Sequence, residues 1–521
     1  MRKRQIVSTN IASLFLFFLF TALYFSSTVG GMNSADGSQY ALTQAIAEKG
    51  TFAIDDFRKW TYRVDYALAN SHYYLDREPG LSILSIPFYI AGKHILPLGN
   101  YPYGGRHPAV DEDSILQALT YLSTASIGAL GVAISFLICL KIGISKKSSF
   151  FTAIIIGAGT LMWKYSASFF REPTFITFFL LSWYFAISSV RLRYVLASGI
   201  MVGFALYVDY SKFFIIPIFI LYYLIKFKKR SSLPISLFVL GLLPLLLSIF
   251  FYNFKVFRNP FTNPHLHKAY FTWMNNPENL FQTPLLPSVA TNLFSFGPID
   301  PHLLTFYWDH PTISRQMGAL FATVWPYKGI FIQTPALFFA IVGWIFFLKK
   351  KKREAIFMFL SILIMFVASS KLTIFWATNM YDTRYFLPVA VVSLLGFGFF
   401  LDTLSRMKHT LFISIIRITT LVGIFFSIEN GWYSNLTHFA PHVSGEHRFY
   451  LSWLHLPFFT PENLTFNIKL FFDATFPNIY NLHLLLLFYF PLFFLIFVVI
   501  FRRNTLSRQK YDRYAGRPSG K

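Results

Sequence analysis

Long apolar runs recur along almost the whole chain, from Leu14 to Phe501, and short polar segments separate them. A helix needs roughly 20 apolar residues to cross about 30 Å of hydrocarbon, and runs of that length are typical of membrane spans. The pattern therefore predicts an all-α, polytopic membrane protein with about twelve transmembrane helices. The predicted spans are 10–29, 115–140, 149–166, 173–190, 195–209, 212–225, 233–252, 330–348, 355–371, 385–402, 410–428 and 482–501.

One further apolar segment, 81–98, is not predicted to cross. It is short, and Pro87, Gly92, Lys93 and His94 interrupt it. Counting it as a span would also put every later basic loop on the wrong side of the membrane. We interpret it as an interfacial helix in the first outer loop.

Positive charge is gathered in the segments that this threading places inside. The chain has 46 Lys and Arg, 23 Asp and Glu, and a formal net charge of +23. Of the basic residues, 26 lie in 2–4, 141–147, 191–193, 226–230, 349–353, 406–408 and 502–521, opposed only by Glu354, Asp402 and Asp512. Because cytoplasmic loops are rich in Lys and Arg, the sequence predicts a multi-pass protein of the cell membrane with both termini cytoplasmic.

Composition narrows the function classes. Hydrophobic residues make up 55% of the chain and charged residues 13%, against about 25% charged in soluble domains, so the basic balance does not indicate a nucleic-acid-binding module. Cys139 is the only cysteine and lies in an apolar run, which excludes intrachain disulfides and cysteine metal sites. The basic start before 11–27 resembles a signal peptide, but we expect it to be retained as the first helix.

The predicted outer segments hold most of the side chains capable of polar chemistry. These segments are 30–114 and 253–329, which belong to a catalytic core of residues 1–428, and 429–481, which precedes a last span and basic tail at 482–521. Simple transporters place their sites at the membrane midplane, so long polar loops on one side favour a site on the outer face.

Three charged residues stand out on the predicted outer side, each close to the start or end of a predicted span or of the interfacial helix. Asp36 follows the first span, where partial desolvation suits a carboxylate to act as a base; the alternative is an N-cap for 37–49. Arg77, beside Pro79 and Gly80, suits a lipid phosphate or is a snorkelling side chain. Glu172, before Pro173, is a second candidate carboxylate or a stabilising first-turn acid.

Other candidates are weaker. Lys328 and Arg384 suit anionic groups, and Tyr40, Tyr74 and Tyr381 are candidate substrate contacts or members of the interfacial aromatic belt. The spacing of His265, His267, His302 and His310 matches no ligand pattern, so no metal site is predicted, and a divalent cation stays an open cofactor. Asn435 and Asn463 head glycosylation triplets.

The order of these features resembles the GT-C superfamily of membrane glycosyltransferases, in particular family 39-like members related to protein O-mannosyltransferases and the aminoarabinose transferase of lipid A. The resemblance implies a GT-C fold and sugar transfer, with inversion, from a polyprenyl-phosphate donor to a glycan, lipid or protein acceptor at the outer leaflet. It implies that Asp36 acts as the base or orients the acceptor, and that Arg77 holds the donor phosphate, with help from Arg384. Membrane lipids are the other expected partners, and nucleic acid is not.

The chain departs from the family pattern at two places. Many relatives have Asp-Glu where this chain has Asp36–Gly37, so Asp55 or Asp56 is a candidate substitute. Glu78 follows Arg77, which leaves the local charge ambiguous.

Rival hypotheses remain open on the sequence alone. A lipid-linked-glycan flippase or transporter would carry charges in mid-span, where Asp209 and Lys212 come closest, although the threading places them in an outer turn. An O-antigen ligase or polymerase would show its dominant loop late in the chain, without the early Asp. A noncatalytic assembly subunit would carry these motifs by accident.

Overall fold

The computed structural model describes residues 2–28, 34–95, 112–323, 327–376, 382–408 and 410–436. The chain divides into the units Met1–Thr475 and Phe476–Lys521, and all described residues belong to the first. The predicted last span 482–501 and its basic tail, Tyr381, Asn463 and the outer loop from 437 onward lie outside the described residues.

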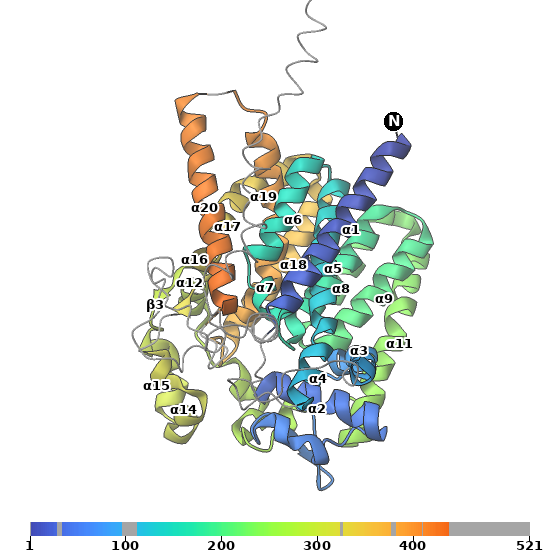
Figure 1. The fold of residues 1–521 in the computed structure, drawn as a ribbon, viewed down its shortest axis with the longest axis vertical. Coiled ribbons are helices and arrows are strands. Elements are labelled where there is room, and N and C mark those ends of the chain that lie inside the picture. The colour runs from blue at the N-terminus through green and yellow to red at the C-terminus, as the bar shows by residue number, and fades with distance from the viewer. Residues whose placement is uncertain are drawn as a thin grey trace, which may run out of the picture. The chain divides into compact units, whose positions relative to one another are not determined.

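Helices account for the other eleven predicted spans (Figure 1). Six of the described helices are long and apolar enough to cross a membrane by length and composition. The helices of the bundle are α1 (Arg2–Ser26), α5 (Leu122–Ile142), α6 (Lys146–Ala158), α7 (Met162–Ser166), α8 (Arg171–Ser188), α9 (Leu192–Val208), α10 (Ile215–Phe227), α11 (Ser232–Phe257), α16 (Ile330–Gln333), α17 (Ala336–Lys350), α18 (Lys352–Lys371), α19 (Leu387–Leu404) and α20 (Leu411–Leu436).

Two predicted spans are broken in the structure. Span 149–166 becomes α6 and α7, separated at Gly159, and span 330–348 becomes α16 and α17, separated at Pro335. Proline disfavours helical backbone at the preceding residue, and Thr334 accordingly adopts φ −135° and ψ 77°. Hydropathy alone does not reveal such breaks, because the side chains on both sides of them are apolar.

The five described basic turns between spans lie at one end of the bundle. Direct contacts link the turns α5–α6, α8–α9, α10–α11, α17–α18 and α19–α20. They are Lys350 Nζ to Gly143 O, Ser145 N to Asp402 Oδ1 (3.4 Å), Lys226 Nζ to Ser189 O (3.0 Å), and the Arg353 guanidinium over the Tyr222 ring (5.5 Å). We call this the basic end.

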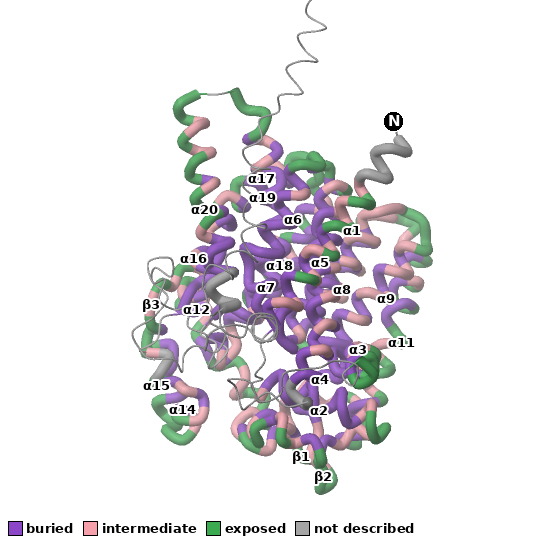
Figure 2. The backbone as a smooth tube through the Cα atoms, viewed as in Figure 1, coloured by how far each residue is buried: buried purple, intermediate pink, exposed green. Residues whose placement is uncertain are grey.

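Burial follows the bundle (Figure 2). Buried positions concentrate along α5, α6, α7 and α19, whereas α20 exposes apolar side chains such as Leu411 (81% exposed), Phe412 (68%) and Ile418 (61%). Exposed apolar surface on a helix of this length is stable in contact with lipid rather than water.

The predicted outer segments 30–114 and 253–329 fold at the opposite end, which we call the cavity end (Figure 1). The first forms α2 (Ser34–Lys49), the hairpin β1 (Ala67–Ala69) and β2 (His72–Tyr74), α3 (Gly80–Ile95) and α4 (Glu112–Thr120). The second forms α12 (Leu285–Phe294), α13 (Thr305–Trp308), α14 (Pro311–Met317), α15 (Ala319–Ala322), and the antiparallel pair β3 (Phe296–Gly297) and β4 (Tyr327–Lys328). The predicted helix 81–98 is present as α3.

Candidate functional site

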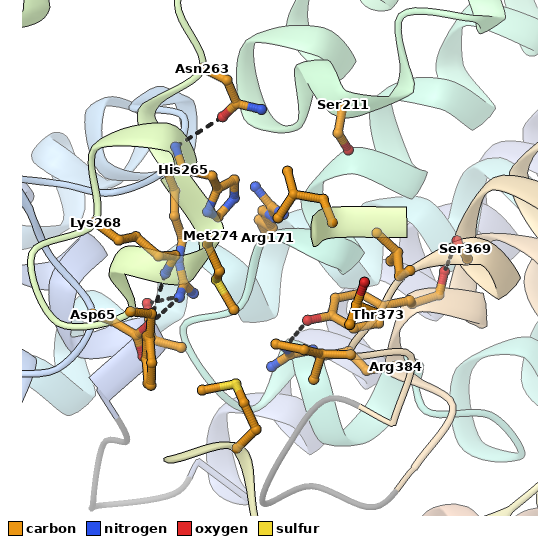
Figure 3. Close-up of a pocket in the computed structure, with 18 of the residues that line it drawn as sticks. Asp65, Arg171, Ser211, Asn263, His265, Lys268, Met274, Ser369, Thr373 and Arg384 are labelled. Atoms are coloured by element: carbon orange, nitrogen blue, oxygen red, sulfur yellow. Dashed lines mark hydrogen bonds and ion pairs between the residues drawn. The ribbon is translucent and has the colours of Figure 1, made fainter. Parts of the chain in front are cut away.

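A cavity of about 760 Å³ lies at the cavity end, between the two loop segments and the ends of the spans (Figure 3). Its charged side chains come from both segments and from span ends, and include Asp65, Arg77, Arg171, Glu172, Lys268 and Arg384. Apolar side chains line the rest, among them Phe213, Phe214, Phe281 and Leu372. The cavity therefore has one wall of charged side chains, which we call the ionic wall, and one of apolar side chains, which we call the apolar wall.

Arg77 is held in place by the turn that leads into α3. A side chain at Gly80 would put its Cβ 2.2 Å from Tyr207 O, so glycine lets the turn pack directly on the end of α9. The Arg77 guanidinium donates to Ala35 O (3.0 Å) and pairs with Asp65 Oδ1 (3.1 Å) and Asp76 Oδ1 (3.2 Å). Arg77 is thus a fixed cavity residue and not a snorkelling one.

Lys268 completes this part of the ionic wall. Its ammonium group pairs with Asp65 Oδ1 (3.2 Å) and with the fully buried Asp76. Burial alone would raise the pKa of Asp76, but Arg77 and Lys268 outweigh it and hold that pKa below its ordinary value. Asp76 therefore remains a carboxylate that fixes two cations.

Glu172 and Arg384, which come from the ends of two different spans, form an ion pair in the cavity wall. Glu172 Oε1 lies 3.3 Å from Arg384 Nε, and both side chains are buried and line the cavity. Arg384 also packs over the ring of Phe170 (4.7 Å) and donates to the Tyr385 hydroxyl (3.0 Å). Glu172 lies in the first turn of α8, where its carboxylate also suits the helix dipole.

A second ion-pair cluster settles the roles of Glu78 and of the α9–α10 turn. Arg171 pairs with Glu78 and lies 3.9 Å from Asp209 Oδ1, and Lys212 pairs with Asp209. Burial raises the pKa of Glu78, against the opposing effect of Arg171. Glu78 thus neutralises the charge of Arg171. Asp209 and Lys212 pair with each other in the turn between α9 and α10, as the predicted threading expects, and are not charges in the middle of a span.

Asp36 is buried, 1% exposed, in the first turn of α2. The helix begins at Ser34, so Asp36 is not the N-cap residue of the cap hypothesis. Burial raises the pKa of the Tyr62 phenol, which lines the cavity, and the negative charge of Asp36 raises it further. Asp36 itself is not among the described residues that line the cavity, whereas its neighbour Ala35 is.

The missing second carboxylate after Asp36 has a steric reason. A Cβ on Gly37 would come within 1.9 Å of Trp60 O, so no Glu fits there. Neither suggested substitute reaches the cavity: Asp55 accepts from Tyr73 N (3.0 Å), and Asp56 pairs with Lys49 on the surface.

Three other predicted site residues lie elsewhere. Lys328 is buried and donates to Asn430 Oδ1 (2.9 Å), and burial lowers its pKa to about 8. Tyr40 packs in an aromatic cluster, 5.2 Å from Trp60 between ring centroids, and Tyr74 packs near Phe257. Among the described residues, none of these three lines the cavity.

The sequence analysis did not predict that Asp65, Arg171, Lys268 or His265 line the cavity. Asp65 and Lys268 lie in irregular loop segments with no motif to distinguish them. His265 was considered only as a metal ligand, yet it lines the cavity, and burial together with Lys268 lowers its pKa well below the ordinary value. Its imidazole is therefore neutral at pH 7.

The described ranges contain no group of three or more His, Cys, Asp or Glu side chains placed to hold a metal ion. The carboxylates of the cavity already have cationic partners, since Asp65, Glu172 and the adjoining Asp76 are each paired with Arg or Lys. A divalent cation as cofactor stays an open prediction.

Similarity to known proteins is confined to three-dimensional structure. No protein-family model and no curated protein matches the chain. The oligosaccharyltransferase of Archaeoglobus fulgidus in its apo form superposes with a TM-score of 0.51 at 14% identity, over 82% of this chain and 56% of that one. The chain has the GT-C fold.

A second GT-C structure, ArnT from Cupriavidus metallidurans bound to undecaprenyl phosphate, superposes with a TM-score of 0.42 at 12% identity, over 90% of this chain and 76% of that one. The chain spans 56% of the length of the oligosaccharyltransferase. The GT-C fold confirms the predicted all-α, multi-pass architecture.

Proposed function

We propose that the protein is a glycosyltransferase that moves a sugar from a polyprenyl-phosphate donor to an acceptor hydroxyl in this cavity. The observation that carries the proposal is the joining of an ionic wall to an apolar wall in one cavity at the end of a membrane bundle. A lipid-linked sugar needs both surfaces, because its phosphate is charged and its tail is insoluble in water.

The donor phosphate suits the space between Arg77 and Arg384. Both guanidinium groups are fixed by carboxylates before substrate arrives, so their donors are already oriented. Preorganised charges of this kind stabilise a developing phosphate anion without further rearrangement. The apolar wall, with Phe213, Phe281 and Leu372, suits the first isoprene units.

Sugar transfer then requires a base for the acceptor hydroxyl and cations that stabilise the leaving phosphate. We assign Asp36, which adjoins the cavity beside Ala35 and acts electrostatically on the cavity-lining Tyr62, to accept the proton of the acceptor hydroxyl as its oxygen attacks the anomeric carbon. The bond from that carbon to the phosphate oxygen breaks, and the polyprenyl phosphate leaves against Arg77 and Arg384. Glu172 holds Arg384 in place. Attack from the side opposite the phosphate inverts the anomeric centre.

The orientation and the partners belong to the same proposal. With the basic end cytoplasmic, the cavity end faces outward from the cell membrane, where a glycan, lipid or protein acceptor meets the donor.

The experiment is release of polyprenyl phosphate by purified protein in lipid, given a polyprenyl-phosphate sugar and an acceptor. Asp36→Asn is expected to reduce release at least about 100-fold, the usual minimum for a lost general base. The matched control is Asp56→Asn, an exposed acid on the same loop segment, which should keep wild-type release.

Full release by Asp36→Asn would contradict the base assignment while leaving transfer itself established. No release by the wild-type protein across a panel of donors and acceptors would count against the function as a whole.

A further inference from the structure

Helix α12 buries polar side chains and exposes apolar ones, which is the opposite of what a helix in a water-exposed loop does. Its two buried residues are polar: Ser288 donates to Ser370 O (2.7 Å), and Asn292 accepts from the Tyr327 hydroxyl (2.6 Å). Its outward face is apolar, with Leu286 78% exposed and Phe294 53% exposed. A helix in water would place these two faces the other way round.

The sequence around α12 also lacks charge. Residues 279–299 contain no Asp, Glu, Lys, Arg or His, although the rest of the second loop segment carries several. At ten residues α12 is too short to cross a bilayer, but it is apolar in composition.

The segment before α12 is fastened to the cavity end of α18, a helix long enough to cross the membrane. Thr283 Oγ1 donates to Leu372 O (2.7 Å), Lys371 Nζ donates to Thr283 O (2.9 Å), and Thr373 N donates to Leu280 O (2.9 Å). These bonds hold α12 against the last turn of α18.

A stack of three aromatic rings, with the buried Phe331 in the middle, links the apolar face of α12 to α17. Phe294 stacks on Phe331 at 5.3 Å, and Phe331 stacks on Phe338 at 4.5 Å. Phe338 and Ile341 of α17 are themselves 46% and 53% exposed, on a helix that coincides with a predicted span. The exposed rings of Phe294 and Phe338 therefore lie on either side of Phe331, which connects the apolar face of α12 to a predicted span.

We propose that α12 is inserted among the acyl chains of the leaflet at the cavity end, with lipid as the occupant of its exposed face. Leu280, Phe281 and Leu372, which join α12 to α18, also line the cavity. Insertion of α12 therefore places the apolar wall of the cavity at the depth of the lipid chains. The inference concerns the membrane surface and does not depend on the chemistry of the cavity.

The test uses single cysteines that carry a bimane fluorophore. Cys139 is buried and is the only cysteine, so Cys139→Ser gives a clean background. The reporter variants are Leu286→Cys and Ala290→Cys on the exposed face of α12, and the control is Thr312→Cys, which is exposed on α14 in the same loop segment. Each protein is reconstituted into phosphatidylcholine vesicles with or without brominated acyl chains, and soluble iodide is titrated separately.

Brominated chains are expected to quench the labels at 286 and 290 several-fold more strongly than the label at 312, and iodide is expected to show the reverse order. Iodide quenching at 286 and 290 equal to that at 312 would overturn the proposal. Protection from both quenchers, with disulfide-linked dimers of Leu286→Cys, would also overturn it, because a second copy would then cover α12. Unchanged melting temperatures confirm that each variant is folded.

Discussion

The carboxylate of Asp382 lies at the centre of a buried network beside Arg384. It accepts from Lys164 Nζ (2.7 Å), from the Tyr165 hydroxyl (2.6 Å) and from the backbone N–H of Arg384 (3.1 Å). Asp382 and Lys164 are each less than 10% exposed as side chains. The network fixes the backbone from which Arg384 reaches into the cavity.

Asp382→Asn and Lys164→Met should each destabilise the protein, because each leaves a buried charge without its partner, at a cost of about 3–5 kcal/mol. The double variant should cost less than the sum, since no charge remains unpaired. Melting temperatures in detergent measure both effects.

The exposed pair Lys49–Asp56 provides the control, with side chains 49% and 64% exposed. Breaking it should cost about 0–1 kcal/mol. Strict additivity in the buried double variant, or an equal cost for the exposed pair, would show that Asp382 and Lys164 are not coupled.

Sequence reasoning located part of the site at this scale. Arg77 was predicted from its turn before the interfacial helix, and Glu172 and Arg384 from their places at the outer ends of spans; the structure brings all three to the cavity wall. Lys328 was predicted for the same reason but lies elsewhere, since position along the membrane normal does not determine lateral position. Asp65 and Lys268 were not predicted, because the paths of irregular loops depend on tertiary packing.

At the scale of elements, α17 and α19 approach unusually closely. A Cβ on Gly343 would lie 1.8 Å from Gly396 O, and Trp344 Nε1 donates to Ser393 O (2.9 Å) across the same contact. Small residues allow such close backbone approach between membrane helices. The contact also fixes α19, whose first residue follows the short η10 helix (Arg384–Phe386) that carries Arg384.

Gly343→Ala should therefore destabilise the protein by about 1–3 kcal/mol, since the added methyl meets backbone rather than a movable side chain. Gly423→Ala is the matched change on α20, where the nearest atom, at 2.8 Å, belongs to the Phe339 ring. Thermal unfolding followed by tryptophan fluorescence compares them. An equal shift in both variants would refute the close-contact explanation.

The sequence predicted most elements of the bundle but not their interruptions or α12. Apolar length is a strong signal for a helix in a membrane: helices occupy the eleven predicted spans that are described, and six of the described helices are long and apolar enough to cross. The polar side of α12 is buried because of its tertiary contacts. Ser288 and Asn292 are typical loop residues in the sequence, and only the structure shows that they bond to Ser370 and Tyr327.

At the scale of the whole molecule, one end of the bundle carries the basic turns and the other carries the loop segments and the cavity. Lys351 lies at the basic end, between α17 and α18, and Asn276 lies in the second loop segment at the cavity end. A reporter fused after Lys351 should therefore behave as cytoplasmic, and one inserted at Asn276 as external. The reverse pattern would overturn the orientation.

Charge predicted this arrangement because the positive-inside bias acts on whole loops and needs no knowledge of packing. The contacts among the five basic turns confirm that they share one end. Which loop residues meet at the other end is decided by tertiary contacts, which the bias does not describe.

The ion pairs around the cavity balance, and this has a consequence for how the sequence can change over generations. Among the described residues, five basic side chains pair with five acidic ones: Arg77, Arg171, Lys212, Lys268 and Arg384 with Asp65, Asp76, Glu78, Glu172 and Asp209. Loss of Lys268 alone would leave Asp65 and the buried Asp76 to share the positive charge of Arg77. Descendants lacking this lysine should therefore also lack one of its acidic partners, so that the network is inherited in pairs.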